Sequence, residues 1–174
     1  ATASSSTYSL NQWHHVAVVR ASSVTKLYVD GVEAISVSDS TNYSGTYLGI
    51  GAIYGAANAQ CFNGSISDFR VVKGTAVYTS AFTPPTAPLT AITNTSLLLN
   101  GTDAGIIDKS QSLKEVKLIA DTKSSTAQYK FLTSSMYFDG TGDYITTNEK
   151  ILPIVQNLDY TVEGWFWATD VSGY

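Results

Sequence analysis

Hydrophobic and polar residues alternate along much of the chain in short runs, and turn-forming residues separate these runs. Alternation with a period of two is typical of β-strands, and no ten-residue stretch shows clear helical periodicity. Many short strands at even spacing favour a sandwich or jelly roll. For residues 114–119 a helix is the alternative. The expected strands include residues 13–20, 26–29, 32–35, 47–53, 69–72, 96–99, 114–119, 135–139, 144–147 and 160–167.

Turn-forming residues mark the breaks between these runs. Asp30-Gly31 lies between two β-prone runs and predicts a type I′ hairpin turn, in which both residues have positive φ. Asn63-Gly64 is a second turn signal. Thr83 to Pro88 contains three prolines, which cannot take part in a central strand. We therefore expect an extended boundary at these residues.

Composition supports a globular β-protein and narrows its function. Apolar residues make up 44% of the 174 residues and charged residues only 14%, so the chain lacks the signature of disorder. The formal net charge is −4, whereas nucleic-acid binding normally shows a clustered basic surface. No segment has the ~18 apolar residues of a membrane helix, and Cys61 is the single cysteine. We expect no nucleic acid among the partners and no membrane insertion.

Several segments resemble one known family. Residues 13–19 (WHHVAVV) with residues 27–31 (LYVDG) resemble a hairpin of laminin-G-like domains, and residues 64–71 (GSISDFRV) resemble the closing strand of that family. Residues 136–145 (MYFDGTGDYI) resemble an early strand pair, and residues 160–166 (YTVEGWF) resemble the strand after it. The resemblance implies an all-β fold, a two-sheet antiparallel β-sandwich (jelly roll) of the concanavalin A-like kind.

These motifs occur in the reverse of the family's order. Residues 1–88 resemble the C-terminal part of a laminin-G-like sandwich, residues 89–96 form a Pro/Thr-rich linker, and residues 97–174 resemble the N-terminal part. The chain is then either one circularly permuted sandwich or a window from a tandem array. Permutation is feasible because the ends of such folds lie at the surface and close together. Residues 70–99 also resemble repeats in structural proteins of marine bacteriophages and in some bacterial surface proteins.

Catalysis has little support in the sequence. Glycoside hydrolysis, which the superfamily includes, needs two carboxylates across a cleft. His14 and His15 are adjacent, so in a strand they point to opposite faces and cannot bind one metal ion together. We expect no enzymatic activity, with a glycoside hydrolase as the remote alternative. None of the glutamates has a partner carboxylate at i+2 or i+4 on its strand; they are Glu33, Glu115, Glu149 and Glu163.

Calcium and a glycan are the two candidate ligands. The resemblance implies that Ca²⁺ can bind at a loop rim, and Asp139 and Asp143 are the candidate ligands, although the loop between them is the sequence of a tight turn. Sugar rings stack on flat aromatic faces, so Tyr43, Tyr47 and Tyr54, which lie near expected loops, are the candidate glycan-binding residues. We expect no other cofactor.

The tryptophans are a further set of aromatic candidates for a sugar-binding groove. Trp13 and Trp165 lie within strand motifs that the family buries, so core packing is their expected role. Trp167 ends the last of these strands.

The expected function follows from the resemblance and from the lack of a catalytic motif. We expect a non-enzymatic structural module of a virion surface or appendage, such as a tail fibre or capsid-surface protein, with a role in host attachment. The alternative is a glycan-binding adhesin module of a bacterial or phage surface protein, assisted by calcium. The expected partners are other copies, other virion proteins and a cell-surface glycan. The expected location is the virion surface or the extracellular space.

Overall fold

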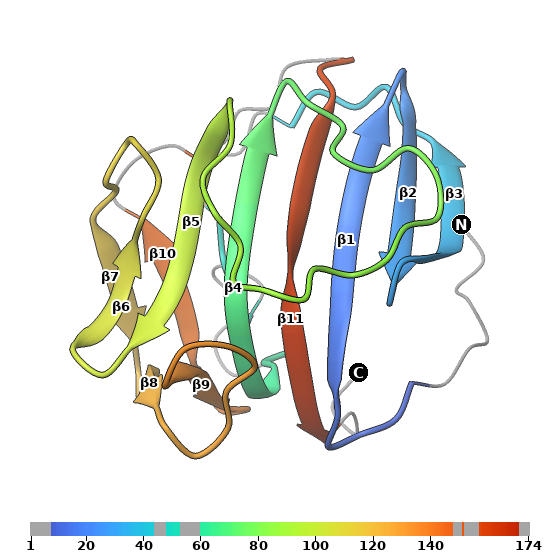
Figure 1. Cartoon of the computed structure of the whole chain (residues 1–174). Coiled ribbons are helices and arrows are strands. Elements are labelled where there is room, and N and C mark those ends of the chain that lie inside the picture. The colour runs from blue at the N-terminus through green and yellow to red at the C-terminus, as the bar shows by residue number, and fades with distance from the viewer. Residues whose placement is uncertain (1–7, 44–47, 53–59, 148–150, 152–156, 171–174) are drawn as a thin grey trace.

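The structure is a computed structural model that describes residues 8–43, 48–52, 60–147, 151 and 157–170. All of its regular elements are β-strands (Figure 1). Within the described part of the chain, no helix is long and apolar enough to cross a membrane. The strands are β1 (Trp13–Ala21), β2 (Val24–Val29), β3 (Val32–Ser38), β4 (Asn63–Lys73), β5 (Thr95–Thr102), β6 (Gly105–Asp108), β7 (Val116–Ile119), β8 (Lys123–Ser125), β9 (Ser135–Asp139), β10 (Tyr144–Thr147) and β11 (Tyr160–Asp170).

The strands form one large sheet and one small sheet, and the paired strands are antiparallel. The main path of the large sheet runs in the order β3-β2-β1-β11-β4-β5-β6. β9 pairs with the first residues of β4, and β8 pairs with β9. β10 and β7 form the small sheet, and a bridge joins Ile145 of β10 to Ile50. The expected all-β, two-sheet antiparallel sandwich is confirmed.

β11 holds the two halves of the chain in the same sheet. It pairs with β1 along one edge and with β4 along the other. β1 and β4 come from residues 1–88, whereas β11 comes from residues 97–174. A strand between two others bonds its backbone N–H and C=O groups along both edges. Without β11, the facing edges of β1 and β4 lose their hydrogen-bonding partner.

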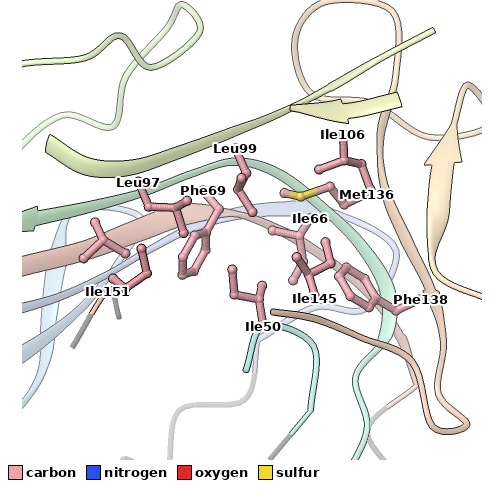
Figure 2. Packing of buried hydrophobic residues seen from close by; sticks show 11 residues of the cluster. Ile50, Ile66, Phe69, Leu97, Leu99, Ile106, Met136, Phe138, Ile145 and Ile151 are labelled. Atoms are coloured by element: carbon pink, nitrogen blue, oxygen red, sulfur yellow. The ribbon is translucent and has the colours of Figure 1, made fainter. Parts of the chain in front are cut away.

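The main hydrophobic core lies between the two sheets (Figure 2). Ile66 and Phe69 of β4 and Leu97 of β5 pack there with Ile145 of β10. Ile66 and Phe69 share this face although they are three residues apart, because β4 has an irregular register around Asp68, whose φ is 54°. We call this side of the large sheet the core face.

A long segment without regular secondary structure, residues 74–92, crosses the opposite side of the large sheet (Figure 1). We call that side the loop face. Tyr78 and Phe82 of the segment pack against a buried cluster that includes Tyr28 of β2. The segment includes Thr83–Pro88, where no strand forms, as the prolines predict. It therefore covers part of the sheet with side chains rather than with a further strand.

The hairpin turn between β2 and β3 anchors this segment. Asp30 and Gly31 have φ values of 50° and 80°, so the predicted pair of positive φ angles is confirmed. The backbone N–H of Phe82 donates to the carbonyl oxygen of Gly31 at 3.0 Å. A Cβ atom at Gly31 would lie 1.8 Å from the carbonyl oxygen of Phe82, so the contact requires glycine.

Two expectations from the sequence are corrected by the structure. Asn63-Gly64 is not a turn, because both residues lie inside β4. Gly64 meets a different need: a Cβ atom there would lie 2.0 Å from the carbonyl oxygen of Trp167 on the neighbouring strand. A strand was expected over residues 47–53, and the described residues there form only isolated bridges at Ile50 and Ala52.

Candidate functional site

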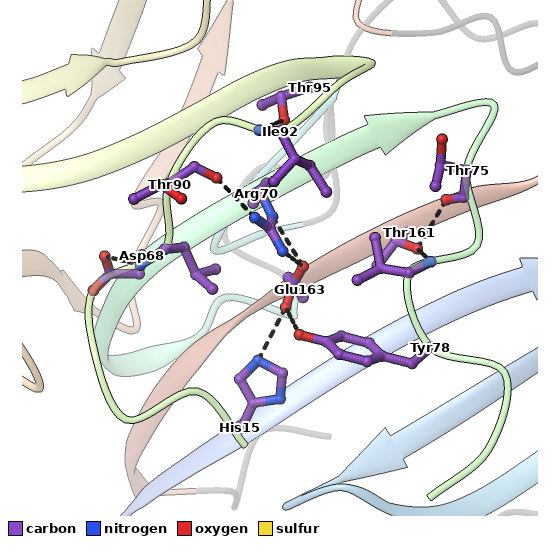
Figure 3. A network of polar contacts seen from close by, with 12 residues as sticks. His15, Asp68, Arg70, Thr75, Tyr78, Thr90, Ile92, Thr95, Thr161 and Glu163 are labelled. Atoms are coloured by element: carbon purple, nitrogen blue, oxygen red, sulfur yellow. Dashed lines mark hydrogen bonds and ion pairs between the residues drawn. The ribbon is translucent and has the colours of Figure 1, made fainter. Parts of the chain in front are cut away.

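A buried polar network on the loop face centres on Glu163 of β11 (Figure 3). Its carboxylate accepts hydrogen bonds from Nε and Nη2 of Arg70 at 3.0 and 2.5 Å and from the hydroxyl of Tyr78 at 2.8 Å. Nε2 of His15 lies 3.2 Å from the same carboxylate. Arg70 also donates to the carbonyl oxygen of Thr90 at 2.7 Å. The network therefore ties three neighbouring strands to the segment that crosses the loop face.

Compensating charge keeps Glu163 ionised although only 1% of its surface is exposed. Burial alone raises the pKa of this carboxyl group, but the hydrogen bond from His15, the charge and hydrogen bonds of Arg70 and the Tyr78 hydroxyl outweigh it and lower the pKa below its ordinary value. Burial and the Glu163 charge raise the pKa of Tyr78 above its ordinary value. The closed network supports the fold and presents no carboxylate to a substrate.

Tyr43, a candidate glycan-binding residue, belongs to a second polar network. Its hydroxyl donates to Asp39 at 3.0 Å, and the guanidinium of Arg20 lies 5.4 Å from its ring centroid. Burial and the hydrogen bond to Asp39 raise the pKa of Tyr43 to about 12. The side chain thus has partners within the protein while 36% of its surface is exposed. The other two candidates, Tyr47 and Tyr54, lie outside the described residues.

Asp139 and Asp143, the candidate calcium ligands, lie around the turn between β9 and β10. Asp143 is fully buried, and its two carboxylate oxygens accept the backbone N–H groups of Asp121 and Asp139, each at 2.8 Å. The Asp139 carboxylate accepts the N–H of Thr141 at 2.7 Å. Both carboxylates fasten the turn. Among the described residues, no group of three or more His, Cys, Asp or Glu side chains is placed to hold a metal ion. The calcium site stays a prediction.

A row of partly exposed aromatic side chains runs across one end of the loop face. Trp13 of β1 pairs with Trp167 of β11, Trp167 pairs with Ser65 of β4, and Ser65 pairs with Tyr137 of β9. Residues paired on neighbouring strands point to the same face. The three aromatic side chains are half-buried, and the small Ser65 separates Trp167 from Tyr137. We call these four residues the aromatic row.

The aromatic row lies beyond the segment that covers the rest of the loop face. The start of β1 and the end of β11, which carry the two tryptophans, meet at one end of the sheet (Figure 1). Residues 74–92 cross these strands nearer their middle. The two indole rings have centroids 5.8 Å apart and are tilted by 59°. The pair therefore presents ring surface at the edge of the molecule.

Two lysine side chains lie next to the aromatic row. Lys123 of β8 is paired in the sheet with Tyr137, and its Nζ lies 5.5 Å from the centroid of the Tyr137 ring. Nζ of Lys130 lies 4.0 Å from the ring centroid of Trp165, which precedes Trp167 by two residues on the same face of β11. The ion pairs of the described residues include neither lysine. Aromatic rings, rather than carboxylates, hold both cations.

The sequence identified only part of this row. Trp165 is buried, as expected, but Trp13 is half-buried rather than in the core. The reason is its position: β2 pairs with β1 only from Val16 onward, so none of the described strands flanks the start of β1 on that side. Tyr137 and the lysines were not candidates, because their proximity to the tryptophans depends on strand order and register.

A small apolar pocket lies on the opposite, core face near the start of β1. His14 and Val16 of β1 contribute to it together with Phe166 of β11. Nδ1 of His14 contacts a carboxylate oxygen of Asp30 at 2.7 Å, and Nε2 contacts the carbonyl oxygen of Ser9 at 3.1 Å. His14 and His15 point to opposite faces, as predicted. Because both nitrogens of His14 already contact oxygen atoms, this pocket offers a ligand mainly apolar surface.

The all-β fold with antiparallel sheets packed around a main core is consistent with a concanavalin A-like β-sandwich. Residues 1–85 match the sequence model of a laminin-G family described as the concanavalin A-like lectin/glucanases superfamily. The match covers the part of the chain that carries β1 to β4, and the likeness of residues 97–174 rests on their motifs. No curated protein and no solved structure matches the chain.

Proposed function

We propose that this chain is a non-enzymatic carbohydrate-binding module that acts in adhesion at a cell or virion surface. The observation that carries the proposal is the aromatic row, which places two half-buried tryptophans side by side at one end of the sheet. Binding sites typically combine apolar and aromatic walls with a few polar groups, and the partly exposed Tyr137 adds a hydroxyl group to the row. The match of residues 1–85 to a superfamily that includes lectins supports the same function.

The placement of Glu163 and Glu33 supports a role without catalysis. Glycoside hydrolysis requires two carboxylates that face a substrate from opposite sides of its glycosidic bond. Glu163 is sealed inside the network with Arg70 and His15. Glu33 lies in β3 and forms an ion pair with Lys26 of the neighbouring strand at 2.8 Å. Neither group faces a second carboxylate in the manner that the reaction needs.

A glycan array with single-residue variants tests this function. Trp13→Ala and Trp167→Ala should each weaken glycan binding about fivefold or more, because removing an aromatic anchor typically costs more than about 1 kcal/mol of binding free energy. Tyr8→Ala is the matched control, since it removes a partly exposed aromatic ring from the pocket on the core face. The array is run with and without Ca²⁺. A wild-type protein that binds no glycan in either condition contradicts the proposal.

A structural role in a virion appendage or capsid surface is the second candidate, and a different observation favours it. Val18, Leu27 and Ile35 are register neighbours on the core face of β1, β2 and β3, and all three are only half-buried. Contiguous apolar surface of this kind often marks contact with another protein. In this role the face packs against other copies of the chain or other virion proteins.

The native mass of the purified chain separates this second role from a solitary module. Light scattering after size exclusion should give a stable oligomer if copies pack through this face, and a Leu27→Asp variant should then dissociate it. A monomer of 18.6 kDa at micromolar concentration contradicts self-assembly and leaves the carbohydrate-binding proposal untouched.

A further inference from the structure

We infer that the aromatic row selects anionic glycans, which carry a carboxylate or sulfate group on the sugar. This inference rests on the carbohydrate-binding function proposed above and names the chemical class of its ligand. It is carried by Lys123 and Lys130, whose ammonium groups lie over rings at or next to the row.

The register of the sheet places one cation at the end of the row. Trp13, Trp167, Ser65, Tyr137 and Lys123 are successive partners across β1, β11, β4, β9 and β8. Neighbouring strands are about 4.8 Å apart, so four strand spacings separate the first residue from the last by about 19 Å. A short oligosaccharide that stacks on the tryptophans therefore reaches Lys123 with its far end.

The second cation lies beside the tryptophans rather than at the end of the row. Nζ of Lys130 lies 4.0 Å from the Trp165 ring centroid, and the Phe131 ring meets the same indole edge-on with centroids 5.8 Å apart. Trp165 is 5% exposed, so Lys130 covers a nearly buried ring. Because Trp165 and Trp167 are two residues apart on the same face of β11, Lys130 lies on the ring next to the one that would stack against the sugar.

The electrostatic surroundings leave both cations available to an anion. Lys26 shows the contrast, because its ammonium group is neutralised by Glu33 at 2.8 Å. The ion pairs found among the described residues include no such partner for Lys123 or Lys130. Asp139, two residues after Tyr137 on β9, is the acidic residue to consider near Lys123. One of its carboxylate oxygens accepts the N–H of Thr141, and the ion pairs among the described residues do not include it.

Because the whole chain carries a net negative charge, binding of an anionic sugar would depend on local cations such as these two lysines. With a formal net charge of −4, the protein as a whole repels polyanions rather than collecting them. An ammonium group that meets a carboxylate or sulfate forms a charge-assisted hydrogen bond, which is stronger than one between neutral groups. Selective binding of an anionic sugar therefore has to come from local cations such as these.

Paired polysaccharides that differ only in charge test the inference. The carboxylate arm compares polygalacturonate with its fully methyl-esterified form, and the sulfate arm compares dextran sulfate with dextran. The protein is the whole chain, either wild type or Lys123→Gln/Lys130→Gln. The control is Lys26→Gln/Lys117→Gln, which removes the same two charges away from the row, from β2 and β7. Thermal melts confirm that all variants stay folded.

We expect the wild-type protein to bind at least one anionic polymer and to bind its neutral form with no more than a tenth of that affinity. Lys123→Gln/Lys130→Gln should lose tenfold or more of the affinity for the anionic polymer, and the control variant should not. Equal affinity for the charged and neutral forms overturns the inference and leaves carbohydrate binding intact. An equal loss in the control variant shows unspecific attraction and also overturns it. Binding to none of the four polymers, together with an empty glycan array, overturns both the inference and the proposed function.

Discussion

Glu163 is the side chain on which the polar network of the loop face depends. Arg70 is 5% exposed and His15 is fully buried, and both contact the Glu163 carboxylate. Removing one partner of a buried ion pair leaves the other charge without compensation, which typically costs about 3–5 kcal/mol. We therefore expect Glu163→Gln to lower the free energy of unfolding by about 3 kcal/mol, as measured by urea denaturation. Glu33→Gln, at an exposed pair, should cost less than about 1 kcal/mol; equal losses would contradict the argument.

Three buried carboxyl groups give the stability an unusual dependence on pH. The pKa of Glu163 lies below its ordinary value, and so does that of Asp39, where burial is outweighed by hydrogen bonds from Thr25, Thr41 and Tyr43. Their contribution to stability is present above about pH 4 and is lost as the pH falls through their folded pKa values. Asp68 changes the stability with pH in the opposite direction, because burial raises the pKa of its carboxyl group above the ordinary value. Its contribution is present at low pH and is lost as the pH rises through the raised value.

Asp68→Asn tests this opposition. The uncharged amide keeps the shape of the side chain and can still accept from Leu89 and Asn100, which bond the same oxygen of Asp68. We expect the unfolding free energy to change more favourably from pH 4 to pH 7 in the variant than in the wild type, because the loss due to Asp68 ionisation is gone. Urea denaturation at both pH values measures this change. Parallel profiles of the two proteins would show that Asp68 does not titrate in this range.

For single residues, the sequence predicted which side chains alternate between the two faces of a strand, but it did not predict which polar side chains contact one another. The opposite directions of His14 and His15 follow from strand geometry alone and are confirmed. The convergence of His15 and Arg70 on Glu163 spans 148 and 93 residues of sequence, so it depends on β11 lying between β1 and β4. Local pattern carries no information about that order.

Among the elements, the hairpin turn and the segment that crosses the loop face depend on each other. Gly31→Ala should displace the segment, because the new Cβ atom would lie 1.8 Å from the Phe82 carbonyl oxygen. Gly74→Ala is the matched control: its φ of 86° resembles the 80° of Gly31, but the nearest heavy atom to its Cβ would be 3.7 Å away.

Each substitution carries the backbone cost of a left-handed residue, about 1–2 kcal/mol, and only Gly31→Ala adds the clash. Hydrogen exchange in residues 74–92 should therefore accelerate clearly more in Gly31→Ala than in Gly74→Ala. Equal exchange in the two variants would mean that the turn does not hold the segment.

Element prediction succeeded where the signal was local and failed where it was not. Asp30-Gly31 sets its own backbone conformation, and the turn is confirmed. Asn63-Gly64 has the same kind of sequence, yet pairing with β9 on one side and β11 on the other makes both residues part of β4. The short strands β6 and β8 were not expected, because the sequence of β6 (GIID) places its two apolar residues next to each other and that of β8 (KSS) contains no apolar residue, so neither alternates.

For the whole molecule, β11 is the strand that joins the two groups of family motifs, because it comes from the second half of the chain and lies between two strands of the first half. The C-terminal half supplies β11, and the match to the superfamily covers residues 1–85, which supply β1 to β4. The sequence therefore predicted the sandwich class. The insertion of the last strand between two early ones could not be read from either half alone, since each half contains only one side of the pairing.

The interlocked halves make a prediction about folding that can be tested with two fragments. Residues 1–92 alone should lack cooperative unfolding, because β1 and β4 would expose the edges that β11 bonds and His15 and Arg70 would lose Glu163. Mixing residues 1–92 with residues 93–174 should restore a cooperative transition by circular dichroism. Residues 93–156, which end before β11, serve as the control and should not restore it. If residues 1–92 unfold cooperatively by themselves, the first half needs no strand from the second. The pairing of β11 with β1 and β4 would then be an addition to a complete domain rather than the centre of a shared sheet.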